Sequence, residues 1–347
     1  LIDDLEIADP ISGTKNWTEV RQFNLMFSTS MGAVTEDSNI IYLRPETAQG
    51  IFVNFLNVQK TGRMKIPFGI AQTGKAFRNE IVARQFIFRM REFEQMEMQF
   101  FIAPGTELDW FEKWKAQRMK WHLALGTPAN KLKFKDHDNL AHYANAATDI
   151  QFEFPFGFKE LEGIHSRTDF DLKSHQELSG KKLTYFDQEK NEAYVPYVVE
   201  TSIGADRMFL AMLSNNLKEE SVPDSKGEDS TRLVFKIHPA LAPVKCAVLP
   251  LVKNKEELTS KAKTIYDKLK LQFQCQYDDK DAIGRRYRRQ DAIGTPICIT
   301  VDFETLDDNC VTVRDRDTLV QQRVPIEKLS AIIAEKTDMS KVLDQLV

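Results

Sequence analysis

The segment Phe77-Arg78-Asn79-Glu80 is followed closely by Arg89-Met90-Arg91-Glu92-Phe93-Glu94-Gln95-Met96-Glu97, and together they predict two strands joined by a charged loop. Alternation places Gln95 and Glu97 of the second strand on the face opposite Met96. One face of this hairpin is therefore unusually polar. Guanidinium groups beside carboxylates on rigid strands suit the binding of a phosphate and of a cationic amine, and a solvated face with weak surface ion pairs is the alternative.

Composition indicates an ordinary globular protein. The chain has 347 residues, of which 42% are hydrophobic and 28% charged, so it is long enough for two domains. Its four cysteines lie in the last third without CxxC spacing, which indicates neither a zinc site nor a disulfide framework. We therefore expect no zinc and a reducing, cytoplasmic location.

Neither a membrane segment nor an export signal is indicated. No apolar run approaches the roughly 20 residues that span a bilayer, and the start at Leu1 lacks the features of a signal peptide. The missing initiator Met suggests that N-terminal residues are absent. The net charge of −4 argues against indiscriminate nucleic-acid binding and leaves a local basic surface open.

Patterning predicts two domains. Residues 1–235 favour an α+β domain with an antiparallel sheet and flanking helices, and residues 239–347 a smaller α/β domain, with a loop or linker at Leu217–Thr231. The expected strands are Ile40–Leu43, Pro67–Asn79, Glu92–Ile102, Thr148–Phe154 and Tyr194–Thr201, and the expected helices are Ala48–Lys60, Thr106–Leu125 and Ala205–Asn216. The second domain should contain a strand at Val244–Leu251, a helix at Lys255–Lys270, strands near Phe273, Ile297 and Val311, and a helix at Pro325–Lys336.

The opening segment resembles motif 2 of the class II aminoacyl-tRNA synthetases, and its form is similar to the homodimer-type glycyl-tRNA synthetase family. The resemblance runs from about Trp17 to the C-terminus. Three further segments that match the family occur in the family's order: Arg44-Pro45-Glu46-Thr47-Ala48-Gln49-Gly50, Glu162-Gly163-Ile164-His165-Ser166-Arg167-Thr168-Asp169 and Glu200-Thr201-Ser202-Ile203-Gly204-Ala205-Asp206-Arg207. The resemblance implies a class II catalytic domain, an anticodon-binding domain, and a ligase that converts glycine and ATP to glycyl-adenylate and charges tRNA(Gly).

Two other functions remain open at this point. One is a synthetase for proline, threonine or histidine, against which Glu200 and Ser202 argue because the strand entering motif 3 often carries glycines at those positions. The other is a catalytically inactive, synthetase-like nucleic-acid-binding subunit. Such a protein would be expected to lose its phosphate-binding arginines, whereas Arg78 and Arg207 are both present.

The resemblance implies an ATP site with two catalytic arginines. Arg78 would contact the α-phosphate, and Arg207, in the first turn of a helix after Gly204, the γ-phosphate end. Phe93 is expected to stack on the adenine, and Glu160 to hold Mg²⁺. The full set of expected ATP-binding residues is Arg78, Asn79, Glu80, Phe88, Arg89, Met90, Arg91, Glu92, Phe93, Glu160, Leu161, Gly204, Ala205, Asp206 and Arg207.

The resemblance also implies a site for glycine. The carboxylates of Glu46, Glu97 and Glu200 would surround its ammonium group. Ser202 would fill the space that a larger substrate needs. Arg167 would neutralise the glycine carboxylate or a phosphate, and His165 is expected to be structural. The expected glycine-binding residues are Glu46, Phe93, Glu94, Gln95, Met96, Glu97, Arg167, Glu200, Thr201, Ser202, Ile203 and Gly204.

A basic cluster in the second domain is the candidate tRNA surface. Arg285, Arg286, Arg288 and Arg289 flank Tyr287, which suits phosphate contacts and base stacking, and a solvated helix face is the alternative. Motif 1, which usually builds the class II dimer interface, is not recognisable in the sequence. The homodimer is consequently implied by the resemblance alone.

Overall fold

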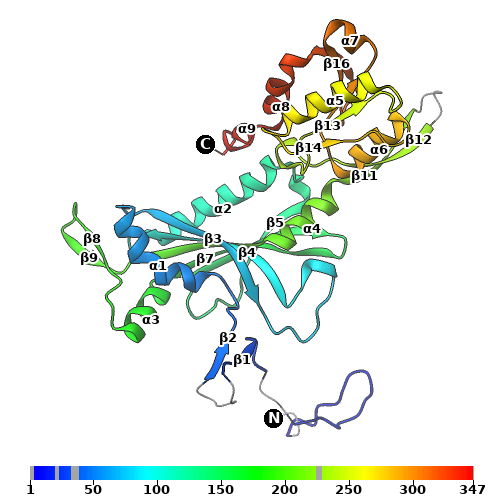
Figure 1. Cartoon of the computed structure of the whole chain (residues 1–347). Coiled ribbons are helices and arrows are strands. Elements are labelled where there is room, and N and C mark those ends of the chain that lie inside the picture. Colours follow the sequence, from blue (N-terminus) through cyan, green and yellow to red (C-terminus); the bar gives the residue numbers. More distant parts are fainter. Residues whose placement is uncertain (1–3, 20–22, 33–38, 224–228, 347) are drawn as a thin grey trace. The chain divides into compact units, whose positions relative to one another are not determined.

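The computed structural model describes residues 4–19, 23–32, 39–223 and 229–346 (Figure 1). The chain divides into two compact units. Unit 1 comprises residues 1–46 and 75–93, and unit 2 comprises residues 47–74 and 94–347. The charged loop of the opening segment therefore belongs to unit 1, and most of both candidate domains belongs to unit 2.

Unit 1 contains a short antiparallel ribbon and the charged loop. Strand β1 (Ser28–Ser30) pairs with β2 (Ile40–Tyr42), which confirms the strand expected at Ile40–Leu43. The loop contains a 3-10 turn at Phe86–Phe88 and is closed by a bridge between Arg84 and Arg89. The loop is thus an ordered excursion between two strands.

Unit 2 is built around a six-stranded sheet of order β3-β4-β10-β7-β6-β5. From β4 onward each strand pairs antiparallel with its neighbour. This order places β4 and β10, which carry the candidate glycine-binding residues, side by side, and it confirms the predicted antiparallel sheet. The strands are β3 (Phe68–Phe77), β4 (Glu92–Ile102), β5 (Leu132–Asp136), β6 (Ala146–Phe154), β7 (Gly157–Thr168) and β10 (Tyr197–Gly204).

Four helices accompany this sheet. The four helices are α1 (Ala48–Thr61), α2 (Glu107–Ala124), α3 (Phe170–Ser179) and α4 (Ala205–Asn216). The predictions of α1, α2 and α4 are confirmed to within one residue at each end, and α3 was not predicted. A small hairpin of β8 (Tyr185–Asp187) and β9 (Glu192–Tyr194) follows α3.

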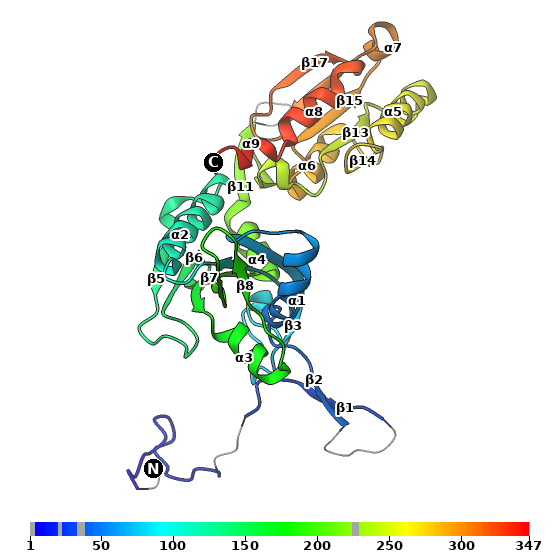
Figure 2. The ribbon, with the colours of Figure 1, turned by 90° about the vertical axis from the view of Figure 1, so that its left-hand side faces the viewer.

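The helices cover both faces of the sheet, as Figures 1 and 2 show. On β4, Phe101 packs in a cluster with Phe52 and Phe55 of α1. Its neighbour Phe100 contacts Trp110 of α2, with ring centroids 4.8 Å apart. Because successive side chains of a strand point to opposite faces, α1 and α2 must lie on opposite sides of the sheet.

The expected linker at Leu217–Thr231 is wrong in its described part. Strands β11 (Leu217–Pro223) and β12 (Asp229–Phe235) form an antiparallel hairpin instead. Arg232 of β12 is 2% exposed and donates to Glu220 at 2.7 Å and to Asp291 at 3.1 Å. The paired charges anchor the hairpin, because breaking a buried ion pair costs about 3–5 kcal/mol.

Beyond the hairpin lies the predicted α/β domain. Its five-stranded sheet has the order β14-β13-β15-β16-β17, with β13 parallel to both neighbours and the last two pairings antiparallel. The strands are β13 (Cys246–Pro250), β14 (Cys275–Tyr277), β15 (Ile297–Val301), β16 (Cys310–Asp315) and β17 (Gln321–Pro325). The helices are α5 (Glu256–Leu269), α6 (Ile283–Ile293), α7 (Glu304–Asp308), α8 (Leu329–Thr337) and α9 (Ser340–Leu343). The expected helix at Pro325–Lys336 starts later because β17 extends to Pro325.

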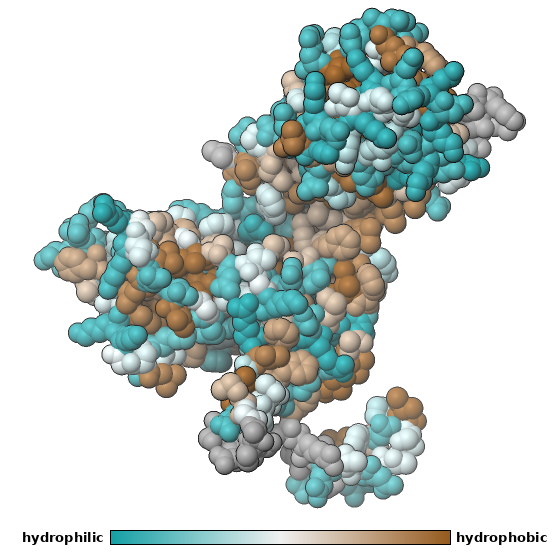
Figure 3. All heavy atoms as spheres, in the orientation of Figure 1, coloured by the Kyte–Doolittle hydropathy of each residue, from teal (hydrophilic) through white to brown (hydrophobic). Residues whose placement is uncertain are grey.

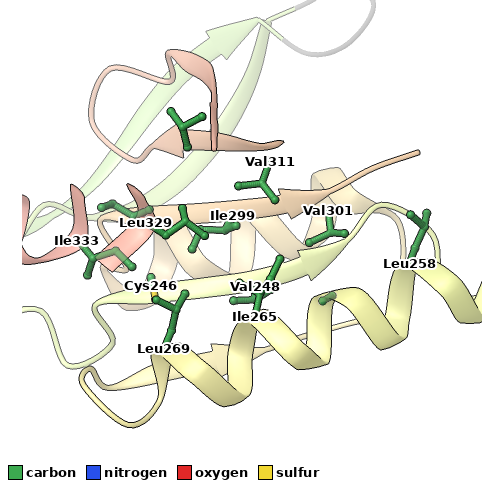
Figure 4. Packing of buried hydrophobic residues seen from close by; sticks show 13 residues of the cluster. Cys246, Val248, Leu258, Ile265, Leu269, Ile299, Val301, Val311, Leu329 and Ile333 are labelled. Atoms are coloured by element: carbon green, nitrogen blue, oxygen red, sulfur yellow. The ribbon is translucent and has the colours of Figure 1, made fainter. Parts of the chain in front are cut away.

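Helices also cover both faces of this smaller sheet. Leu258 and Ile265 of α5 and Ile333 of α8 pack on Val248 of β13 and its neighbours (Figure 4). On the other face, Ile283 and Tyr287 of α6 pack against Ala247, Leu249 and Cys298. Each fully buried aliphatic side chain contributes about 1.5–3 kcal/mol. In the orientation of Figure 3, the outer surface of this domain is mostly hydrophilic.

Candidate active site

The polar residues of β4 and β10 share the sheet face that carries Phe101. Ser202 lies opposite Glu97 in the strand register, and Glu200 lies opposite Gln99. Because Phe101 packs against α1, this face is apolar at one end and polar at the other. Glu97 and Glu200 are each only 3% exposed. Buried carboxylates are costly unless they are paired or hydrogen-bonded, so their partners define the site. We name this region the acidic face: Gln95, Glu97, Gln99, Glu200 and Ser202.

Glu200 is held in its charged form by three side chains. Its Oε2 accepts hydrogen bonds from Arg167 Nη1 at 2.9 Å and from Gln99 Nε2 at 2.5 Å. The Nδ1 atom of His165 lies 3.2 Å from Oε1. Burial alone would raise the pKa of Glu200, but these neighbours outweigh it and lower the pKa to about 2. The acidic face therefore carries a fixed negative charge at neutral pH.

Glu97 is held by the start of α1. The backbone N–H of Thr47 donates to Glu97 Oε2 at 2.8 Å, and the Thr47 hydroxyl donates to the same oxygen. Thr47 is the N-cap residue of α1, where the helix dipole favours a carboxylate. Gln95 Nε2 donates to Glu97 Oε1 at 3.0 Å and to Ser202 Oγ at 2.8 Å. The Gln95 amide therefore joins the two strands and fixes the Ser202 side chain.

Arg167 is positioned by residues that sequence reasoning missed. Asp171, in the first turn of α3, accepts from Arg167 Nε at 2.8 Å and from Nη2 at 2.9 Å. Gln49 of α1 donates to Asp171 at 3.1 Å, and its Oε1 lies 2.7 Å from His175 Nε2. The guanidinium carbon also lies 4.1 Å from the ring centroid of Tyr143. The i, i+4 spacing of Arg167 and Asp171 was the one signal in the sequence, and it became meaningful only with helix α3.

The structure places the predicted glycine-binding residues other than Gly204 in three settings. The acidic face and Arg167 come together, as described. Alternation along the strands directs the side chains of Glu94, Met96, Thr201 and Ile203 to the opposite face, so they could reach a ligand only through backbone atoms. Glu46 and Phe93 belong to unit 1, whereas the acidic face and Arg167 belong to unit 2.

Arg207 and Glu160 form a pair at the start of α4. Gly204 is the N-cap of this helix, so Ala205, Asp206 and Arg207 occupy its first turn. Arg207 Nη1 lies 3.2 Å from Glu160 Oε1 and donates to the Glu160 carbonyl at 3.1 Å. The Glu160 side chain is 55% exposed.

Two other expected ATP-binding residues have structural contacts. Asp206 accepts a hydrogen bond from the Glu94 backbone N–H at 2.9 Å, which ties helix α4 to strand β4. Leu161 is buried in the core at 2% exposure. The Leu161 side chain therefore cannot contact ATP.

In unit 1, the charged loop is braced by its own arginines. Arg78 Nε donates to the Pro45 carbonyl at 3.1 Å, and its guanidinium carbon lies 5.4 Å from the Phe93 ring centroid. Arg89 pairs with Glu80 at 3.1 Å, and Arg91 donates to the Glu80 carbonyl at 2.9 Å.

The remaining expected ATP-binding residues of unit 1 fall into three settings. Asn79 is bound to the segment at residues 24–25, through its backbone N–H to Leu25 at 2.7 Å. Phe88 is buried and Met90 is half-buried. Glu92 pairs with Lys75 on the exposed side.

The arginines of α6 have different surroundings. Arg285 is 78% exposed in its side chain, Arg288 donates to Ser230 at 2.8 Å, and Arg289 pairs with Asp278 at 2.7 Å. Arg286 is 1% exposed and donates to backbone carbonyls, among them that of Pro250 at 2.5 Å. Its inclusion in an RNA-contact surface is contradicted, because a buried guanidinium that satisfies main-chain carbonyls cannot reach a phosphate.

Two features are absent from the described part of the chain. Within it, no helix has the length and apolar character needed to cross a bilayer. Within the same residues, no group of three or more His, Cys, Asp or Glu side chains is arranged to hold a metal ion.

Three family models match the chain. The model of the tRNA synthetase class II core domain (G, H, P, S and T) covers residues 30–216, and that of the anticodon binding domain covers residues 245–336. The described fold agrees with both, since the first span holds the six-stranded sheet and the second the smaller α/β sheet. Together they define a class II tRNA synthetase. A model of the glycyl-tRNA synthetase insertion domain 1 also matches residues 1–25, so the resemblance begins before Trp17.

Comparison with similar proteins identifies the family within this class of synthetases. The glycine–tRNA ligase of Chlorobaculum tepidum is 56% identical over 337 residues, covering 97% of this chain and 70% of the relative. That of Macrococcus caseolyticus is 56% identical, covering 96% and 71%, and that of Staphylococcus aureus strain JH9 is 53% identical, covering 97% and 72%. This chain belongs to the glycine–tRNA ligase family.

Proposed function

We propose that this chain activates glycine with ATP and transfers the glycyl group to tRNA(Gly). In the first step the glycine carboxylate attacks the α-phosphorus, the bond to the β-phosphate oxygen breaks, and pyrophosphate leaves. The protein contributes alignment and charge stabilisation to such a displacement, because no covalent intermediate with a side chain is needed. The observation that carries the proposal is the acidic face, where the buried carboxylates of Glu97 and Glu200 share one side of the sheet and Glu200 is paired with Arg167.

The acidic face suits a small zwitterion. Glu97 and Glu200 would accept hydrogen bonds from the ammonium group, and both are already oriented by neighbours, so little reorganisation accompanies binding. Ser202 lies opposite Glu97 on the same face, and its hydroxyl oxygen accepts a hydrogen bond from Gln95 at 2.8 Å. A substituent on the α-carbon would have to displace this pair. We therefore expect steric rejection of larger amino acids, which discriminates more strongly than a pocket that only lacks a methylene contact.

The phosphates would be bound by arginines. Arg207 lies in the first turn of α4, where backbone N–H groups and the helix dipole also favour an anion. Arg78 would neutralise charge at the α-phosphate. Magnesium would be held by Glu160 together with the phosphates, which fits a site with a single exposed carboxylate because Mg²⁺ is often bound by one or two carboxylates plus substrate oxygens. When bound, Mg²⁺ would offset the phosphate charge.

Two finer assignments belong to the same proposal. We infer a homodimeric, cytoplasmic enzyme, and its support is that one chain carries both the class II core and the anticodon-binding domain. The exposed Arg285 and Arg289, together with the half-buried Arg288, would contact tRNA. Light scattering of the purified protein tests the dimer, and a monomer at micromolar concentration would contradict it.

ATP–pyrophosphate exchange with each amino acid in turn tests the activity. We expect exchange with glycine and little with alanine or serine. In Glu97→Gln the side chain keeps its size but loses its charge, so the KM for glycine should rise far more than the KM for ATP. Glu153→Gln, on the exposed side of β6, is the matched control and should change neither. An equal rise in both KM values for Glu97→Gln would place the residue outside the glycine site.

A further inference from the structure

Two cysteines meet in the smaller domain. Cys246 and Cys275 are paired in register on the adjacent parallel strands β13 and β14. Their Sγ atoms lie 3.1 Å apart. The other two cysteines lie elsewhere: Cys298 packs in the cluster on the opposite face of the sheet, and the Cys310 thiol lies 3.5 Å from the Asp308 carbonyl.

The register of β13 and β14 is compatible with a disulfide between these two residues. Neighbouring strands lie about 4.8 Å apart, and bridged cysteines have Cα atoms roughly 4.4–6.8 Å apart. Side chains of an in-register pair project to the same face. Bond formation therefore needs only a small approach of the two sulfur atoms and no exchange of strand partners.

The two thiols differ in their surroundings. Cys246 is fully buried among Ile265, Leu269 and Ile333. Cys275 lies on the edge strand β14 and is partly exposed. The hydrogen bond from Cys246 lowers the pKa of the Cys275 thiol, whereas the same contact and burial raise the pKa of Cys246. An accessible thiol with thiolate character beside a buried second thiol is the arrangement that redox-sensitive cysteine pairs use.

We propose that Cys275 and Cys246 form a site of reversible oxidation by hydroperoxides. The Cys275 thiolate attacks a peroxide oxygen, the O–O bond breaks, and Cys275 becomes a sulfenic acid while hydroxide takes up a proton and leaves as water. The Cys246 thiol then attacks that sulfur, the S–O bond breaks, and a second water leaves. Two thiols lose two electrons in total and one hydrogen peroxide gains them. A dithiol reductant reverses the process by thiol–disulfide exchange.

The bond would stiffen the strand that leads to α6. Strand β14 ends at Tyr277, and the next residue is Asp278. The Asp278 carboxylate accepts a hydrogen bond from Arg289 at 2.7 Å, and the Asp278 carbonyl accepts one from Arg286 at 3.2 Å. The cross-link would thus hold the edge strand against β13 immediately before the segment that orients these two arginines. The oxidation site itself does not depend on the proposed function.

Hydrogen peroxide titration of the reduced, full-length chain tests the proposal. We expect the number of free thiols, counted after denaturation, to fall from four to two with loss of two hydrogen atoms per chain. Peptide mapping should find Cys246 linked to Cys275, and dithiothreitol should restore all four thiols. Persistence of both thiols at peroxide doses that oxidise Cys310 would overturn the proposal, as would linkage between chains.

Variants separate the roles of the two sulfur atoms. Cys246→Ala keeps the core apolar, and should leave a sulfenic acid on Cys275 that dimedone captures. Cys275→Ser should abolish both the bridge and dimedone capture at Cys246. Cys310→Ser, the control with a partly exposed thiol, should form the bridge like the unaltered chain. Dimedone capture at Cys246 rather than Cys275 in single variants would contradict the assigned order of attack.

Discussion

Two aspartates at the start of α3 offer a comparison of a buried and an exposed ion pair in one segment. Arg167–Asp171 and Asp169–Lys173 have the same i, i+4 spacing, with closest contacts of 2.8 Å and 2.7 Å. The side chains of Arg167 and Asp171 are 4% and 6% exposed, whereas that of Lys173 is 55% exposed. Burial is therefore the main difference between them. We predict that Asp171→Asn destabilises this region strongly and that Asp169→Asn does so weakly.

The contacts of each aspartate determine how much free energy of unfolding its replacement should cost. Asn at position 171 keeps one acceptor oxygen, but its NH₂ group would face a guanidinium N–H, so Arg167 loses part of its partner in a buried setting. Breaking a buried pair costs about 3–5 kcal/mol, and the retained oxygen places our expectation near the lower limit. Exposed pairs contribute about 0.2–1 kcal/mol. A cost of about 3 kcal/mol corresponds to local opening on the order of 100-fold more frequent, against less than about sixfold for the control.

Hydrogen–deuterium exchange of peptides from β7 and α3 measures this opening directly. Glycine-dependent exchange activity adds a second readout: if Asp171 positions Arg167 for the substrate, Asp171→Asn should raise the KM for glycine while the KM for ATP stays near its original value. Equal protection in the Asp171 and Asp169 variants would refute the reasoning, because it would mean that the buried network does not stabilise this region.

Three further predictions concern other parts of the chain. Arg78→Ala and Arg207→Ala should each lower glycine-dependent pyrophosphate exchange by about 10²–10³-fold without changing the circular dichroism spectrum, and near-normal exchange would remove the residue from the phosphate site. The pKa of Glu200 is lowered from 4.5 to about 2, so the stability that its carboxylate contributes is present above pH 4.5 and is lost as the pH falls toward 2. Denaturant titrations across this range should show that the difference in unfolding free energy between the unaltered chain and Glu200→Gln shrinks by up to about 3 kcal/mol. A difference that stays constant with pH would contradict the lowered pKa. Replacing Arg285, Arg288 and Arg289 by Gln should weaken tRNA binding and reduce the slope of log K against log salt by roughly 0.7–0.9 for each lost phosphate contact, whereas an unchanged slope would mean that these arginines make no such contact.

Much of the fold could be predicted because local patterns determined it. The bounds of β4 and α4 follow from alternation and from the Gly204 cap, and the structure places both where the sequence indicated. Alternation also identified the polar side of β4. It could not show that this side is the buried one, because burial depends on α1, α3 and the neighbouring strands. The polar pattern therefore described the acidic face but not its environment.

The features that the sequence did not predict have a common physical cause, because each depends on a contact between residues that are distant in the sequence. The hairpin of β11 and β12 has the polar composition of a linker, yet Arg232 pairs with Asp291, fifty-nine positions away. Asp171 acquired a role only when helix α3 turned it toward Arg167 and brought Gln49 of α1 within 3.1 Å. Composition records neither contact.

The basic cluster of α6 shows how helical periodicity divides residues that composition treats alike. Ile283 and Tyr287, four positions apart, face the sheet, and Arg286 lies between them on the same side. Arg285 and Arg289, also four apart, lie on the exposed side next to Asp281. The helical period of 3.6, counted from the two apolar positions, is enough to separate the buried arginine from the exposed ones. A run of like charges on a helix is thus two surfaces, and only the one opposite the apolar positions is available to a nucleic acid.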